Sequence, residues 1–168
     1  MKPFIRLFLT FSFFFLANAV QAQKASFDQW GIAFDFPKDW KVTDQEDFGG
    51  NNYYLAVEKN GNDASGLFMI TITPNKIDLE EHIKSFQENI SASIPGAKTG
   101  AVKSGSFGSY TGAMSDYTFS LLGIDHQAVM YCFYVNDKTV LVVTQEANED
   151  HNENEQGFEQ IEKSLRIK

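Results

Sequence analysis

The sequence predicts an α+β fold, an antiparallel β-sheet flanked by helices, and three observations lead to this prediction. Segments of alternating or continuous apolar residues recur between turn signals over most of the chain. Two segments, one near the middle and one near the end, carry apolar residues at helical spacing. The resulting order of strands, helix, strands and helix is that of an antiparallel sheet with helices packed against it.

The N-terminal segment has the tripartite pattern of a secretory signal peptide. Lys2 and Arg6 precede a run of almost only Leu and Phe at 7–16, and small residues at 17–22 follow. The run is shorter than the roughly 20 residues that a membrane-spanning helix needs. We therefore expect an exported protein, periplasmic or secreted, with cleavage after Ala22 or alternatively after Ala19.

The remaining chain, 23–168, has the size and charge of one acidic domain. The whole chain holds 14 Lys and Arg against 22 Asp and Glu, and loss of Lys2 and Arg6 changes its net charge from −8 to −10. Nucleic acids and anionic membranes require clustered basic residues, so the acidic charge argues against both as partners. Cationic partners and divalent metal ions remain open. No second apolar run is long enough to span a membrane.

Cys132 is the one cysteine of the chain, so an internal disulfide is excluded. It lies in an apolar strand, where a buried, unreactive thiol is expected rather than a nucleophile.

The first half of the domain predicts a series of strands. Ile32, Phe34 and Phe36 alternate with smaller or polar residues, and Pro37 begins a turn. Further strands are expected at 40–43, 53–58 and 67–73, the last two joined by a hairpin that contains Asn60-Gly61 and the last ended by Pro74.

A helix is expected over about 79–94. Leu79, Ile83, Phe86, Ile90 and Ile94 form its apolar stripe. Asp78 is placed as N-cap with Glu81 three residues later, a capping box, and Pro95-Gly96 ends the helix.

The second half predicts strands at 101–107, 110–121, 127–135 and 139–145, with turns at 108–109, 122–126 and 136–138. Nearly all residues of 128–135 and 140–143 are apolar, as in central strands covered on both faces. A final amphipathic helix carries Phe158, Ile161 and Leu165.

Two segments resemble known domains. Gly31-Ile-Ala-Phe-Asp-Phe-Pro37-Lys-Asp-Trp40-Lys-Val42 resembles the opening of PsbP-like and Mog1-like domains, and 158–167 resembles their closing helix. The resemblance implies the fold of that superfamily, with Pro37 at a corner and Trp40 in the core. It also implies a protein without enzymatic activity, since most members of that superfamily are not enzymes. Some members are photosystem subunits, but no residue of this sequence matches a binding motif of those subunits. Another member acts in nuclear transport, which conflicts with the predicted export of this chain.

The histidines and glycines offer little catalytic chemistry. Asp125-His126 could be half of an acid–base pair, but a histidine at a strand border is more often only exposed. His126 and Cys132 are six residues apart on one strand, roughly 20 Å at 3.3 Å per residue, and cannot form a dyad. A Gly-x-Ser-x-Gly elbow is absent, His82 is expected beside the solvated face of the first helix, and no cofactor is expected.

The acidic segment 146–155 is the one candidate for metal binding. Glu149, Asp150 and His151 lie within it, and carboxylates with imidazole could hold a divalent cation. Their spacing fits neither an EF-hand nor a His-Glu-x-x-His motif. A solvated loop whose acids favour the N-terminal end of the last helix is the preferred interpretation.

The leading hypothesis is therefore a non-catalytic binding or accessory domain of the cell envelope that contacts another envelope protein. A metal-binding protein using 146–155 is the second hypothesis, and a hydrolase with an unfamiliar site, around Asp125-His126, is the third.

Overall fold

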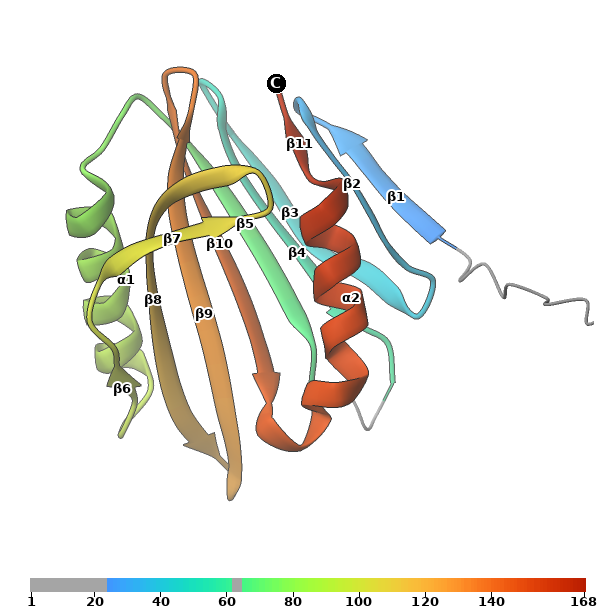
Figure 1. Ribbon diagram of the computed structural model, residues 1–168, viewed down its shortest axis with the longest axis vertical. Coiled ribbons are helices and arrows are strands. Elements are labelled where there is room, and N and C mark those ends of the chain that lie inside the picture. The colour runs from blue at the N-terminus through green and yellow to red at the C-terminus, as the bar shows by residue number, and fades with distance from the viewer. Residues whose placement is uncertain (1–23, 62–64) are drawn as a thin grey trace, which may run out of the picture.

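The computed structural model describes residues 24–61 and 65–168, so the predicted signal peptide lies outside the described residues. In these ranges the chain forms eleven strands, two α-helices and one 3₁₀ turn, shown in Figure 1. The strands are β1 (Lys24–Gln29), β2 (Ile32–Pro37), β3 (Trp40–Gly49), β4 (Asn52–Lys59), β5 (Leu67–Pro74), β6 (Lys98–Thr99), β7 (Lys103–Phe107), β8 (Tyr110–Leu121), β9 (Ile124–Val135), β10 (Lys138–Ala147) and β11 (Arg166–Ile167). The helices are α1 (Leu79–Ser93), the 3₁₀ turn η1 (Asn148–Asp150) and α2 (His151–Ser164).

The strands form a large and a small antiparallel sheet. The large sheet has eight strands: seven run in the order β3-β4-β5-β10-β9-β8-β6, and β7 also pairs with β8. The small sheet has the order β1-β2-β11. This architecture confirms the predicted α+β class. It also explains why residues 140–143 of β10 are all apolar, because this part of the strand lies in the middle of the large sheet and is covered on both faces.

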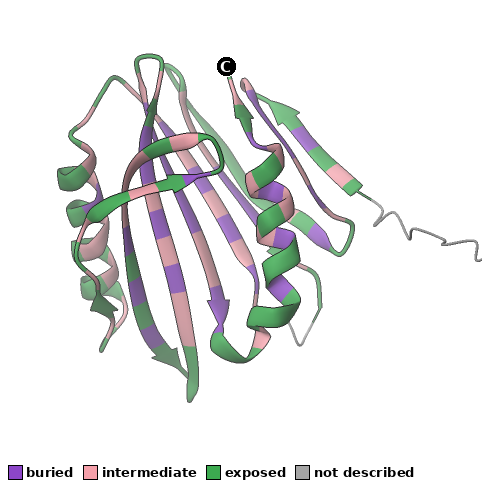
Figure 2. Cartoon of the chain, in the orientation of Figure 1, coloured by how far each residue is buried: buried purple, intermediate pink, exposed green. Residues whose placement is uncertain are grey.

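One face of the large sheet packs against β2 and α2. Phe34 and Phe36 of β2 join Phe68 of β5 and Ile161 of α2 in a core rich in aromatic side chains. The Ser164 hydroxyl accepts a hydrogen bond of 2.8 Å from the backbone N–H of Asp35, which joins the end of α2 to β2. Figure 2 shows the buried residues as bands that alternate along the strands.

Trp40 fixes the position of α2 on this face. The indole is buried, and the ring of Phe158 meets it edge-on with centroids 5.2 Å apart. A Cβ atom at Gly157 would lie 2.6 Å from the indole, and one at Gly66 would lie 2.9 Å from it. Both glycines are therefore required by the close approach of the backbone to Trp40.

The opposite face packs against α1. Ile83 is fully buried there beside Met130, Cys132 and Leu141, and the other apolar residues of the predicted stripe pack around this cluster. The Asp78 side chain accepts a hydrogen bond from the Glu81 N–H at 3.0 Å, as predicted for the N-cap. The expected helix is thus confirmed and ends at Ser93.

Most predicted strands are confirmed, but two boundaries differ by several residues and three strands were not predicted. The strand that begins at Trp40 runs on to Gly49 because it pairs with β4 along nearly its full length. The predicted turn 122–126 contains only Leu122 and Gly123, since β9 resumes at Ile124. The strand β1, which pairs with β2 along its whole length, was not predicted, and neither were the short strands β6 and β11.

The acidic segment 146–155 is not the predicted loop. Glu146 and Ala147 belong to β10, the next three residues form η1, and α2 begins at His151. None of the helices in the described part of the chain has the length and apolar character of a membrane span.

Candidate functional site

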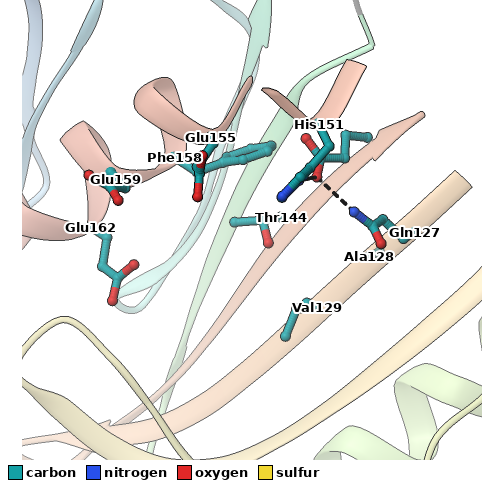
Figure 3. Close-up of a pocket in the computed structure, with 10 residues that line it drawn as sticks. Gln127, Ala128, Val129, Thr144, His151, Glu155, Phe158, Glu159 and Glu162 are labelled. Carbon is teal, nitrogen blue, oxygen red and sulfur yellow. Dashed lines mark hydrogen bonds and ion pairs between the residues drawn. The ribbon is translucent and has the colours of Figure 1, made fainter. Parts of the chain in front are cut away.

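A half-open groove of about 260 Å³ lies between α2 and the strands β9 and β10 (Figure 3). Its strand side is formed by Gln127, Ala128, Val129, Thr144 and Glu146. Its helix side is formed by His151, Glu155, Phe158, Glu159 and Glu162. The groove thus combines a strand side of mixed polar and apolar residues with a strongly acidic helix side.

The antiparallel register brings the strand residues together. Thr144 lies opposite Val129, and Glu146 lies opposite Gln127, on the pair β10 and β9. Side chains two residues apart on a strand point to the same face. Thr144 and Glu146 therefore continue the face that carries the buried Val140 and Val142, but with polar side chains.

The helix residues follow from the spacing along α2. Positions 151, 155, 158, 159 and 162 lie three or four residues apart, so they form one stripe of the helix. This stripe lies beside the buried edge of α2, where Asn154, Gly157 and Ile161 pack on the sheet. In Figure 3 the labelled glutamates of α2 line the groove on the helix side.

Glu146 is the most enclosed charged group of the groove, with only 5% of its surface exposed. Its Oε1 atom accepts a hydrogen bond from Gln127 Nε2 at 3.0 Å and lies 2.7 Å from His151 Nδ1. Its Oε2 atom is buried and has no hydrogen-bond partner among the described residues. A buried carboxylate oxygen without a donor is costly, so Glu146 can accept a further donor.

The Glu146 carboxylate sets the charge of its neighbour. The hydrogen bond from His151 and the negative charge of Glu146 raise the pKa of His151 above its ordinary value, and Glu155 adds to this effect. The imidazole itself is half exposed. Glu146 is therefore a buried anion, and the partly exposed imidazole of His151 that covers it binds a proton more readily than a free histidine.

The remaining acids of the groove have other contacts. Glu162 Oε1 accepts a hydrogen bond from the backbone N–H of Gly108 at 2.8 Å, which joins the turn between β7 and β8 to α2. Glu159 forms an ion pair with Lys163 one helical turn later. Both carboxylates still line the groove.

The three residues considered as metal ligands are placed differently. His151 meets Glu146, as described, while Asp150 accepts hydrogen bonds from the backbone and hydroxyl of Ser65 at 3.1 and 2.7 Å. Glu149 lies in η1 and does not line the groove. Within residues 24–61 and 65–168, no group of three or more His, Cys, Asp or Glu side chains could hold a metal ion.

The other candidates of the sequence lie outside the groove. Cys132 is fully buried under α1 on the opposite face, and burial raises the pKa of its thiol to about 12. His126 stacks on Phe119, with ring centroids 4.8 Å apart, and its Nδ1 atom is buried without a hydrogen-bond partner among the described residues. His82 is partly buried, and this burial lowers the pKa of its imidazole.

Sequence reasoning missed Gln127, Thr144 and Phe158 as site residues. One signal was available, because Glu146 falls in the buried phase of an apolar strand, where a charged residue is unexpected. The contact of that strand with α2 depends on tertiary packing and had no signal in the sequence.

Comparisons with solved structures support the fold. The cyanobacterial PsbP of Synechocystis sp. PCC 6803 has a TM-score of 0.56 at 11% identity and covers 87% of this chain and 92% of its own. This chain has a PsbP-like fold. LpqN of Mycobacterium tuberculosis, described as involved in cell envelope biogenesis, has a TM-score of 0.53 at 11% identity, with 86% and 90% covered.

A Pseudomonas aeruginosa protein of unknown function has a TM-score of 0.52 at 13% identity and covers 86% of this chain and 97% of its own. No family model and no curated protein sequence matches the chain. The resemblance found in the sequence is therefore confirmed for the fold, and at these identities it says nothing of the ligand.

Proposed function

We propose that the chain is an exported, non-catalytic binding or accessory protein of the cell envelope, and that the groove beside α2 holds its partner. The observation that carries this proposal is Glu146, a buried carboxylate that lines an open groove and has an oxygen without a partner in the described part of the chain. Binding sites combine an apolar lining with a few placed polar groups in this way.

Three further observations support the proposal. The first 22 residues have the pattern of a signal peptide. The fold is shared with PsbP and with LpqN, and the latter is described as a protein of cell envelope biogenesis. The net charge of −8, or −10 after the predicted cleavage, would draw a cationic partner toward the acidic groove.

Photo-crosslinking in native cells tests this proposal. A photoreactive amino acid at Glu155 stands at the exposed rim of the groove, and the same amino acid at Glu88 stands on the exposed side of α1. Each change removes one negative charge from an α-helix, so the pair is matched. We expect the chain in the envelope fraction and a specific protein adduct from position 155 but not from 88. Equal adducts from both positions, or none from 155, would overturn the proposal.

An enzyme is the second candidate, and the Glu146–His151 pair is what favours it. A carboxylate that orients an imidazole through Nδ1 leaves Nε2 to act as a general base. A panel of hydrolase substrates compared across wild type, His151→Gln and His126→Ala would test this candidate. Turnover that is lost only in His151→Gln would support it, and equal rates in all three proteins would remove it.

A further inference from the structure

The groove restricts the chemistry of its ligand through the one buried carboxylate at its base. Glu146 Oε1 already has Gln127 and His151 as neighbours, while Oε2 has no donor within the described ranges. A ligand that brings an N–H donor to this oxygen would relieve the cost of leaving it unpartnered. A ligand that is also cationic would gain more, since charge-assisted hydrogen bonds are about twice as strong as neutral ones.

The rim of the groove favours positive charge as well. Glu155, Glu159 and Glu162 line it from the helix side. Opposing charges at the rim are few: Lys163 is paired with Glu159, and His151 is paired with Glu146. The field in the groove therefore attracts cations and repels anions.

The walls indicate that the cation carries an apolar stem. The side chain of Val129 lies on the strand side, and the ring of Phe158 lies on the helix side, whereas the side chain of Ala128 points to the α1 face. A volume of about 260 Å³ is far larger than the ~30 Å³ that one water occupies in the liquid. The groove thus has room for a chain of several carbon atoms beside these apolar groups.

A bare metal ion fits this arrangement poorly. Calcium takes six to eight oxygen ligands. The described ranges offer no group of three or more metal-binding side chains, and Glu146 has only one unengaged oxygen. An ammonium group has three donors and requires only hydrogen-bond acceptors around it. Glu146 and Thr144 line the groove, and their carboxylate and hydroxyl oxygens are acceptors.

We infer that the groove binds a primary ammonium group on an aliphatic stem, the chemistry of a lysine side chain of a partner protein or of a free diamine, with Glu146 as its counter-ion. This inference rests on the proposed binding function and specifies the chemistry of the ligand. Glu146 receives the ammonium at Oε2, Val129 and Phe158 contact the stem, and His151 remains on Oε1. A lysine-bearing partner and a free diamine share this recognition.

Calorimetry with matched probes tests the inference at neutral pH. The probes are a short lysine peptide, the same peptide with norleucine in place of lysine, 1,5-diaminopentane and calcium chloride. Norleucine keeps an apolar stem and lacks the ammonium group. We expect the lysine peptide or the diamine to bind and the norleucine peptide and calcium not to bind. Stronger binding of the peptide indicates a protein partner, and stronger binding of the diamine indicates a free ligand.

Variants locate the binding. Glu146→Gln keeps the shape of the side chain and removes its charge, and we expect it to weaken binding of the lysine peptide roughly tenfold or more. Glu88→Gln removes the same charge from an exposed position on α1 and should leave the affinity unchanged. In case Glu146→Gln does not fold, amide chemical shifts of the wild type give a second test. The largest shifts on titration should fall on Gln127, Thr144, Glu146 and His151.

Equal binding of the lysine and norleucine peptides, no binding of either ammonium probe, or shifts confined to another part of the molecule would each overturn the inference. Preferential binding of calcium would overturn it too and would favour a metal site. The proposed function is tested separately. An adduct from position 155 in cells together with silent ammonium probes means that the groove binds a partner of other chemistry, whereas binding of the probes without an adduct removes the envelope partner and keeps the ammonium site.

Discussion

The two faces of the large sheet are covered in different ways, and the difference indicates where the molecule can bind. On one face α1 lays an apolar stripe over an apolar surface and closes the middle of that face, with Ile83 at the centre of the cluster. On the other face α2 packs by its buried edge against Trp40 and the aromatic core. Beside that edge an acidic stripe of α2 stands over Thr144 and Glu146 and leaves the groove open.

This contrast separates residues that hold the fold from residues that are available for a ligand. An amphipathic helix that matches its sheet face gains stability by burying apolar area. The buried Ser115 hydroxyl on the α1 face is satisfied, since it accepts a hydrogen bond from Gln87 and donates one to the Gly100 carbonyl. A buried carboxylate such as Glu146 opposes stability unless it is satisfied. Its presence on the α2 face is therefore better explained by binding than by folding.

The largest expected effect belongs to the closed face. Ile83→Ala removes a fully buried side chain from the α1 cluster, and we expect it to lower the free energy of unfolding by about 3 kcal/mol. Chemical denaturation measures this loss. Affinity for the lysine peptide should stay unchanged in the folded variant, because the groove lies on the other face.

Ser85→Ala is the control for this prediction. Ser85 is exposed on the same helix, so the change should stay within about 0.5 kcal/mol of wild type. If Ile83→Ala cost no more than Ser85→Ala, α1 would not be the closing helix that the comparison describes.

The second effect belongs to the anchored edge of α2. Alanine is favoured over glycine inside helices by about 1 kcal/mol, so propensity alone predicts that Gly157→Ala stabilises the protein. A Cβ atom there would lie 2.6 Å from the Trp40 indole, which is buried and cannot move aside freely. We expect a net loss of about 2 kcal/mol from this overpacking, measured by thermal or chemical denaturation.

Gln156→Ala provides the comparison at the neighbouring, exposed position of α2. It should be neutral to within about 0.5 kcal/mol. If Gly157→Ala stabilised the protein, α2 would not need its close approach to Trp40. The packing of α2 on its sheet face would then not differ from that of α1 in this respect.

The sequence could predict the closed face and much of the sheet, for physical reasons. The spacing of Leu79, Ile83 and Phe86, with an N-cap at Asp78, is local information and suffices to define α1. The hairpin signals and the apolar run 140–143 likewise located most strands, although β3 runs six residues beyond its predicted end. The predicted order of the elements, together with the resemblance of the segment that contains Pro37 and Trp40, was sufficient to predict the fold.

The groove could not be predicted in the same way because its residues come from separate elements. The first part of α2 has few apolar residues, so its helical spacing was visible only from Phe158 onward and the preceding acids were expected in a loop. The pairing of Glu146 with Gln127 depends on the register of β10 and β9. The contact with His151 additionally depends on where α2 begins, which is fixed by packing.

The smallest effect compares the histidines of the two helices. His151 on α2 has a raised pKa because it bonds to Glu146, so its contribution to stability is fully present below its ordinary pKa of about 6.5 and is lost as the pH rises through the folded value. His82 on α1 has a pKa lowered by burial, so the folded state resists its protonation and loses stability as the pH falls.

Denaturation of wild type, His151→Gln and His82→Gln at about pH 5.5 and about pH 8.5 measures both effects, since these values lie on either side of the ordinary pKa. The stability that wild type has over His151→Gln should be larger at the lower pH, and that over His82→Gln should be larger at the higher pH. The His151 effect should be small, because its side chain is 51% exposed and solvent screens the pair with Glu146. The same pH dependence in both variants would mean that Glu146 does not act on His151 as a buried anion, and the groove would lose the charged group on which its binding of cations depends.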